Sequence, residues 1–163
     1  MPETTKEALH QELVASITAE RDRLIAAHKA SQAGVVSEES RAESDKDMRS
    51  TEASYLARGQ ALRVEALEAD RQRVASMKLR AFTDEDAIAM SALVTLESSH
   101  NPRRVVVFLA PAGGGVRLGP DGAVQVVTHA SPLGRALLGA RAGDTVEVPR
   151  AGAMEEIEIV EVA

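Results

Sequence analysis

The chain has 163 residues, no cysteine and a formal net charge of −6. Without cysteine it can hold neither a disulfide framework nor a thiolate metal site. Its polar first residues, followed by no long apolar run, predict a cytoplasmic protein without a membrane span. Residues 1–80 carry 13 basic and 14 acidic side chains, and residues 81–163 carry 6 and 11. This charge balance argues against a protein that acts mainly by binding nucleic acid through a basic surface.

The first part of the chain predicts one long helix. Residues 4–33 are rich in Ala, Glu, Lys, Arg and Leu and contain no glycine or proline. Spacings of four or seven residues place five side chains on one face of that helix: Leu9, Leu13, Ile17, Leu24 and His28. At 1.5 Å per residue the helix would be roughly 45 Å long. Gly34 predicts its C-terminal end.

A second helix is predicted from about residue 44 to residue 78, after a turn within residues 34–44. Gly59 interrupts it at a cost of about 1 kcal/mol relative to alanine. Its apolar face is predicted to hold Leu56, Leu67, Val74 and Met77, with Tyr55 and Leu62 beside it. Two helices of similar length joined by a short turn are expected to pack antiparallel. Their narrow apolar stripes are typical of a two-stranded coiled coil.

Carboxylates gather around the predicted turn, which makes it the candidate tip of a helical hairpin. Four of them lie close together, mixed with Lys46 and Arg49: Glu43, Asp45, Asp47 and Glu52. The helix dipole favours acidic residues at a helix start in any protein, so a solvated, capped tip is the alternative to a chemical role. Tyr55, the only tyrosine, is expected to pack below the tip rather than to act in catalysis.

After Arg80 the composition changes to β-branched runs separated by turn signals. Residues 83–86 predict a linker or a short capped turn, and residues 119–122 (Gly-Pro-Asp-Gly) predict a hairpin turn. A compact helix is marked by Ser131 as its N-cap, Pro132 as its first residue and Gly139 as its stop. Five or so strands with one short helix make a half-open sheet domain of the α+β type. The predicted strands cover residues 92–97, 104–109, 116–118, 124–127, 145–148 and 157–162.

Other chemical motifs are absent from the sequence. The glycines at 113–115 are not followed by Gly-Lys-Ser/Thr, so they predict a flexible loop and not a phosphate cradle. No Ser-centred nucleophile motif is present. The four histidines are scattered, and none shows metal-ligand spacing: His10, His28, His100 and His129. The chain is therefore not expected to be an enzyme on its own or to hold a cofactor of its own.

The order of parts resembles the Gre family of bacterial transcription elongation factors, GreA and GreB, over nearly the whole chain. The closest stretches are residues 130–139 (Ala-Ser-Pro-Leu-Gly-Arg-Ala-Leu-Leu-Gly), 142–148 and 156–162. They look like the family's C-terminal signature of a Ser-Pro cap, a short helix, a Gly-Asp turn and two closing strands. The resemblance implies an antiparallel coiled-coil hairpin over residues 1–80 and a C-terminal FKBP-like domain over residues 81–163.

The resemblance also implies a function and a partner. Gre factors insert the coiled coil into the secondary channel of RNA polymerase, while the C-terminal domain docks at its rim. Contact with nascent RNA and DNA is indirect, and the factor is expected to be a monomer. Tip carboxylates then help to hold a second Mg²⁺ at the polymerase active site, which promotes cleavage of backtracked transcript. Hard cations prefer oxygen ligands, and two metals can stabilise both the attacking and the leaving oxygen.

Carried onto this sequence, the tip role falls on Asp45, Asp47 and Glu52, of which Asp45 and Asp47 would contact the metal. The residues implied in polymerase binding are Tyr55, Ser131, Pro132 and Arg135. The tip departs from the family, because the Asp-x-x-Glu-Asn sequence is absent and the connection is longer. Some Gre-like proteins occupy the same channel and inhibit the polymerase, and that alternative stays open here.

Two further hypotheses come from other classes of protein. An FKBP-like domain could act as a prolyl isomerase, but that activity needs an aromatic-lined pocket, and Phe82 and Phe108 alone do not supply one. A structural protein could instead dimerise through the helices of residues 4–78. A mass that depends on concentration would favour such a scaffold, and a monomer of large hydrodynamic radius would favour the intramolecular hairpin.

Overall fold

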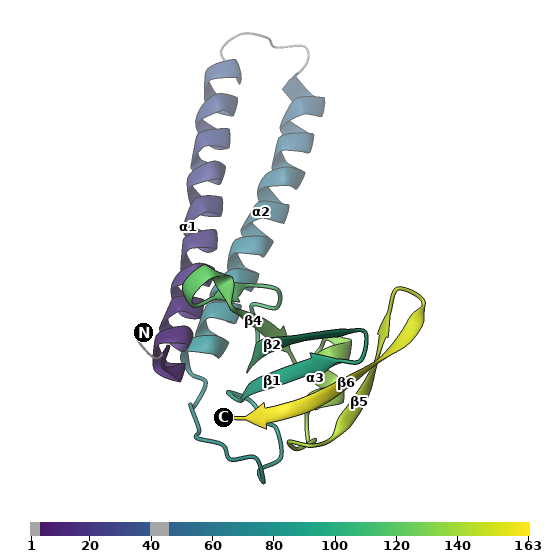
Figure 1. The fold of residues 1–163 in the computed structure, drawn as a ribbon. Helices are drawn as coiled ribbons and strands as arrows, with labels where there is room; N and C mark the ends of the chain where they lie inside the picture. The colour runs from purple at the N-terminus through teal and green to yellow at the C-terminus, as the bar shows by residue number, and fades with distance from the viewer. Residues whose placement is uncertain (1–3, 40–45) are drawn as a thin grey trace. The chain divides into compact units, whose positions relative to one another are not determined.

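The computed structural model describes residues 4–39 and 46–163, with side chains placed for residues 4–30 and 55–163. Two helices come first, and a six-stranded sheet with one short α-helix follows (Figure 1), which confirms the predicted α+β class. The elements are α1 (Lys6–Glu39), α2 (Lys46–Ala75), β1 (Leu93–Ser98), β2 (Asn101–Ala110), β3 (Arg117–Leu118), the 3-10 turn η1 (Pro120–Gly122), β4 (Val124–Thr128), α3 (Pro132–Leu137), β5 (Thr145–Arg150) and β6 (Ala153–Val162).

The chain divides into two compact units by its internal contacts. One unit comprises Met1–Ala15 together with Gln72–Ala163, and the other is Ser16–Arg71. Both long helices therefore contribute residues to each unit. The domain boundary between residues 80 and 81 stays a prediction.

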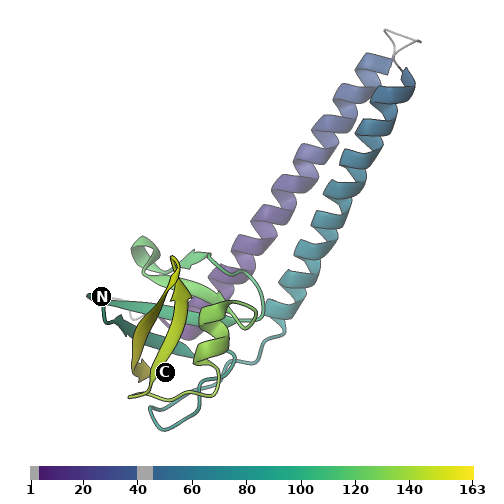
Figure 2. The same ribbon diagram turned by 90° about the vertical axis from the view of Figure 1, so that its right-hand side faces the viewer.

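Within Ser16–Arg71, α1 and α2 run antiparallel and side by side (Figures 1 and 2). Hydrogen bonds cross between them, since Arg21 donates to Glu68, Arg63 donates to Glu20 over 3.2 Å, and His28 lies 3.0 Å from the Gln60 amide oxygen. The predicted helical hairpin is thus confirmed as a pairing within one chain. None of the described helices is both long and apolar enough to cross a bilayer.

The helix ends differ from those predicted. α1 continues through Gly34 to Glu39, so the predicted stop at Gly34 is wrong. One glycine inside a helix costs only about 1 kcal/mol, and the helical residues on either side absorb that cost. α2 runs from Lys46 to Ala75, a little shorter than predicted at both ends. Residues 40–45 lie outside the described part of the chain.

The apolar stripe of α1 is confirmed and that of α2 only in part. Leu9, Leu13 and Ile17 are buried on α1, and Leu24 and His28 are half-buried. On α2, Leu67 and Val74 are buried, but Leu56 is 69% exposed. Met77 is half-buried and lies just after the end of α2 at Ala75. The inward placement predicted for Leu56 is wrong because Leu56 lines a groove beside Gly59, which has no side chain to cover it.

The sheet has the strand order β3-β4-β2-β1-β6-β5, and only the β2–β4 pair is parallel. Side chains alternate between its two faces. One face forms the main core with α3 and with residues that precede β1; this core contains Phe82, Ile88, Val94, Leu96, Val107, Leu109, Val127, Leu137, Val148, Ile157 and Ile159. Six strands form, one at each of the six predicted ranges and within a few residues of its predicted bounds.

The opposite face is apolar at its β2–β4–β3 end. Phe108 and Val126 are buried there as register partners, and Leu118 of β3 is buried as well. The start of α1 is tied to this part of the same unit, because Glu12 accepts a 2.9 Å hydrogen bond from the backbone of Gly119. Lys6 Nζ donates to the carbonyl oxygens of Arg80 over 2.6 Å and Ala163 over 3.0 Å. These polar contacts fix the first turns of α1.

Two short local motifs form as their sequences predict. Thr83–Asp86 is a capped turn, in which the Asp86 carboxylate accepts from the Thr83 backbone over 2.8 Å. In α3, Ser131 is the N-cap, Pro132 occupies the first turn, and Gly139 follows the helix with a φ of 85°. Gly134 lies so close to β4 that a Cβ atom there would be 1.9 Å from the Thr128 carbonyl oxygen.

Replacing Gly134 with alanine should therefore destabilise the protein. The new methyl group has to displace backbone, and overpacking of this kind costs about 2 kcal/mol or more. Thermal unfolding followed by circular dichroism measures the effect. The matched control is Gly59→Ala, which adds the same methyl group to an open helical surface. That control should raise stability by about 0.5–1 kcal/mol. Equal stability of Gly134→Ala and the wild type would contradict the packing described here.

Candidate functional site

The predicted tip lies mostly outside the described residues. Asp45 is not described, while Asp47 and Glu52 belong to α2 in a stretch for which only the backbone is described. Among the residues that the structure describes, no three His, Cys, Asp or Glu side chains come together in a way that could hold a metal ion. The metal-positioning role of Asp45, Asp47 and Glu52 stays a prediction.

Tyr55, the first described side chain beyond the tip, points into solvent. Its side chain is 70% exposed, so the expectation that it packs below the tip is wrong. Beside it, Leu56 and Leu62 are also exposed, at 69% and 60%. A groove of about 370 Å³ runs along this surface, and it is lined by Leu24, Tyr55, Leu56, Gly59, Gln60 and Arg63. The arrangement offers an apolar contact surface with one phenol group.

Below this groove, the two helices are held in register by a charged network. Arg71 uses two of its nitrogens to bind both oxygens of Glu68, at 2.9 and 2.6 Å, and Arg21 donates to the same carboxylate from α1. These hydrogen bonds raise the pKa of Arg21 and of Arg71. A bidentate pair fixes orientation as well as distance. The network therefore determines how α1 and α2 are matched along their length.

The second predicted contact site surrounds α3. The Ser131 hydroxyl donates to the Thr128 carbonyl over 2.8 Å and accepts from the Gly134 backbone over 3.0 Å. Both hydrogen bonds are internal, so Ser131 positions the loop. Pro132 and Arg135 are exposed, and Arg135 donates to the Ala130 carbonyl over 3.0 Å. The structure thus brings Ser131, Pro132 and Arg135 together, whereas Tyr55 belongs to the other unit.

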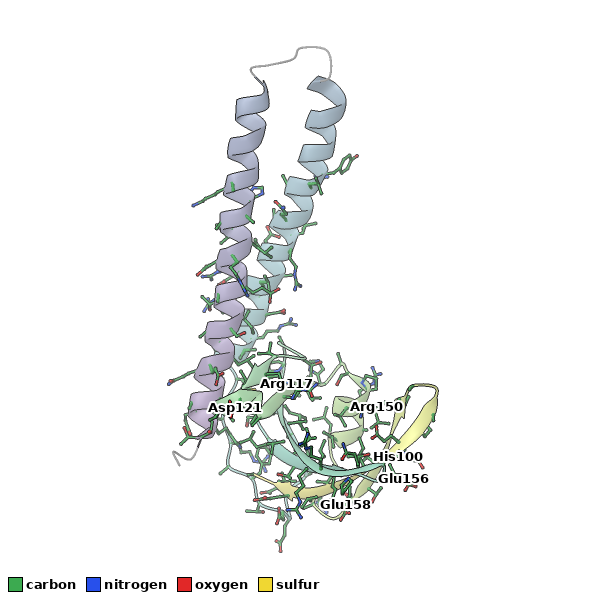
Figure 3. All side chains as sticks on the ribbon, turned by 45° about the horizontal axis from the view of Figure 1, so that its top comes forward. His100, Arg117, Asp121, Arg150, Glu156 and Glu158 are labelled. Atoms are coloured by element: carbon green, nitrogen blue, oxygen red, sulfur yellow. The ribbon has the colours of Figure 1, made fainter. Side chains whose placement is uncertain are left out.

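A charged surface that the sequence analysis missed lies on the β1–β6–β5 end of the sheet. Glu147 of β5 is directly opposite Glu156 of β6, and Glu158 of β6 lies between Glu97 of β1 and Thr145 of β5. Figure 3 labels Glu156 and Glu158. The sequence signal was the alternation of residues 156–159, Glu-Ile-Glu-Ile, because it places both isoleucines in the core and both glutamates outside.

One carboxylate of β6 faces the other way. Glu155 is buried at the end of the core face, where it accepts hydrogen bonds from the Ser98 hydroxyl and, over 3.0 Å, from Arg150. The hydrogen bond from Ser98 and then that from Arg150 lower the pKa of Glu155 below its ordinary value of 4.5. This cluster joins the β1–β2 turn to the β5–β6 hairpin and has a structural role rather than a binding role.

Comparisons with known proteins match the C-terminal part of the chain to a protein family. Residues 83–163 match the family model described as transcription elongation factor, GreA/GreB, C-term. The solved structure of the transcription factor Gfh1 is similar with a TM-score of 0.42 and 25% identity, over 95% of this chain and 93% of that one. The structure of Gfh1 from Thermus thermophilus is similar with a TM-score of 0.40 and 24% sequence identity, over 94% of each chain. The structure of GreA/GreB from Nitrosomonas europaea is similar with a TM-score of 0.38 and 21% sequence identity, over 60% of this chain and 78% of that one. No curated protein matches in sequence.

The Glu155 cluster predicts a defined acid sensitivity. Because folding lowers the pKa of Glu155, its contribution to stability is complete above pH 4.5 and is lost as the pH falls through the lower folded-state value. Glu155→Gln should therefore lose stability less steeply than the wild type on acidification below pH 4.5. Chemical denaturation at stepped pH measures this slope. Glu161→Gln, at an exposed position of the same strand opposite Thr95, is the matched control and should keep the wild-type slope. Parallel curves for all three proteins would contradict the assignment.

Proposed function

Through residues 83–163 this chain belongs to the GreA/GreB family of transcription elongation factors, and we propose that it binds RNA polymerase and regulates elongation. The observation that carries the proposal is the joining of that C-terminal domain to an antiparallel pair of long helices in one chain. The C-terminal domain docks on the polymerase, and the helical pair enters its secondary channel.

The dimensions of the helices support this use. α1 has 34 residues and α2 has 30, which correspond to about 51 and 45 Å at 1.5 Å per residue. Such lengths suit a device that reaches a buried centre through a channel. The network of Arg21, Glu68 and Arg71 would keep the two helices matched during insertion.

Docking would use the exposed residues of each unit. Around α3, Pro132 and Arg135 face solvent and present an apolar ring and a cation, while Ser131 holds their loop in place. On α2, Tyr55 provides the contact surface nearest the tip. Each of these residues was singled out by the family resemblance, and the exposure of Tyr55, Pro132 and Arg135 is compatible with partner binding.

Stimulated transcript cleavage is the proposed effect on the polymerase. In that reaction Asp45, Asp47 and Glu52 would add oxygen ligands to a second Mg²⁺ at the polymerase active site. The chain would supply ligands and the polymerase the chemistry, so the protein is not an enzyme on its own. A chain that fills the channel without presenting such ligands would inhibit instead, and this is the alternative effect.

A prolyl isomerase function receives no support from the aromatic residues. Phe108 is fully buried in the sheet and Phe82 is 8% exposed. Lys6 and Arg80 lie over the Phe82 ring, with their charged groups 4.9 and 4.6 Å from its centroid. Neither ring is available to line a substrate pocket.

The function is tested by transcript cleavage in a stalled, backtracked polymerase complex with Mg²⁺. The wild type should shorten the transcript, and the triple variant Asp45→Ala, Asp47→Ala, Glu52→Ala should lose most of that activity because the added metal ligands are gone. A matched triple variant, Glu7→Ala, Glu65→Ala, Glu85→Ala, removes three exposed carboxylates elsewhere and should cleave like the wild type.

Polymerase binding by the same proteins separates the outcomes. Binding without cleavage by the wild type would favour the channel-filling inhibitor. Equal loss of cleavage in both triple variants would contradict a specific role for the tip carboxylates. No binding to the polymerase at all would overturn the proposed function.

A further inference from the structure

The helical pair is packed unevenly along its length. We call residues 22–30 of α1 together with residues 55–66 of α2 the tip-side stretch; none of their side chains is buried. Ile17 and Leu67, just outside this stretch, are each 3% exposed. Because buried apolar surface is the main source of helix pairing, the hydrophobic effect contributes less to pairing in the tip-side stretch than at Ile17 and Leu67.

The seam of α2 in the tip-side stretch includes a polar residue. Ala57, Gln60, Val64 and Leu67 recur at spacings of three, four and three residues, which is the heptad spacing of a coiled-coil seam. The first three are half-buried. Gln60 therefore occupies a position at which an apolar side chain is usual. A polar side chain at such a position lowers stability, and its known use is to fix how two helices pair.

His28 of α1 meets Gln60 across the seam. Its Nδ1 lies 3.0 Å from the Oε1 of Gln60, and both side chains are half-buried. Because an amide oxygen only accepts hydrogen bonds, Nδ1 is the donor. A second cross-helix contact, from Arg63 to Glu20, joins side chains that are 56% and 44% exposed, and exposed ion pairs contribute little to pairing. The hydrogen bond between His28 and Gln60 is therefore the stronger tie.

Gln60 belongs to the same continuous helix as two of the predicted tip carboxylates. Since α2 begins at Lys46, the backbone is helical from Asp47 and Glu52 to Gln60, over about 20 and 12 Å respectively. Helices bend only gently over such lengths. The distance of Gln60 from α1 therefore sets the distance of the α2 backbone at Asp47 and Glu52 from α1.

We propose that His28 and Gln60 are positioning residues, whose hydrogen bond holds the tip-side stretch of α2 beside α1 and so places Asp47 and Glu52. Without this bond the two helices would part in the tip-side stretch, while Ile17 and Leu67 stay packed. The pairing itself does not depend on the proposed function. Its consequence for transcript cleavage rests on that function.

The pairing is tested in the full chain by the distance between two spin labels. The chain has no cysteine, so cysteines introduced at the exposed positions Ala30 and Ala61 carry both labels. Pulsed electron paramagnetic resonance then measures how the distance between α1 and α2 is distributed. The protein that carries only these labels should give one narrow distribution.

Substitutions at Gln60 test the hydrogen bond. Gln60→Ala removes the acceptor, and the ratio of parted to paired helices should rise about fivefold, which broadens the distribution toward longer distances. Gln60→Glu keeps an acceptor oxygen for His28 and should restore the narrow distribution. Arg63→Gln is the matched control, because it removes the exposed contact with Glu20 and should leave the distribution unchanged.

Transcript cleavage at a saturating concentration of the factor is the second readout. Gln60→Ala should lower the cleavage rate by the fraction of molecules whose helices have parted, because only paired helices place Asp47 and Glu52 correctly. Gln60→Glu should restore the rate. Circular dichroism checks that all variants keep the wild-type helix content, which separates a positioning role from loss of the fold.

Three outcomes would overturn the proposal. The first is an unchanged distance distribution in Gln60→Ala, whatever the cleavage rate. The second is a broad distribution that Gln60→Glu does not restore, since the hydrogen bond would then not be its cause. The third is a broad distribution with cleavage at the wild-type rate, because the contact would then not place Asp47 and Glu52. A wild type that does not cleave contradicts the proposed effect on the polymerase instead, and the distances alone then decide the pairing.

Discussion

The two-residue period of the β-strands is the constraint on which the rest of the structure depends. In β6 the period puts Ile157 and Ile159 into the core and Glu156 and Glu158 into solvent. A shift of one residue would bury the glutamates and expose the isoleucines, so the register is strongly determined. The same register brings glutamates of neighbouring strands opposite each other. The buried core and the exposed, facing glutamates are therefore two consequences of one alternation.

The helical pair depends on a different balance, because its apolar stripes are narrow. Ile17 and Leu67 are buried within Ser16–Arg71. Because these apolar contacts are few, the hydrogen bonds from the arginines around Glu68 fix the orientation of the two helices. Nearer the tip, Leu56 is exposed beside Gly59. The hairpin thus combines a well-packed stretch with a stretch whose apolar side chains remain available to a partner.

Much of the fold could be predicted because its signals are local. Ser131, Pro132 and Gly139 delimit α3 through capping and backbone preferences that need no distant contact. The strands follow from β-branched runs between turns. The end of α1 was misjudged at Gly34, since a glycine is a weak helix breaker when good helix formers flank it. The metal-positioning role of the tip residues Asp45, Asp47 and Glu52 stays a prediction.

The sequence by itself determined the α+β class, the helical hairpin, the short capped helix and the family resemblance of the C-terminal part, because each rests on short-range periodicity and turn chemistry. Only the tertiary structure decided which strands are neighbours, and hence that Glu147 faces Glu156 and that Glu155 is buried against Ser98 and Arg150. It also decided that Tyr55 and Leu56 are exposed. Exposure and pairing depend on residues that are distant in the sequence and close in space, and the local sequence does not specify those contacts.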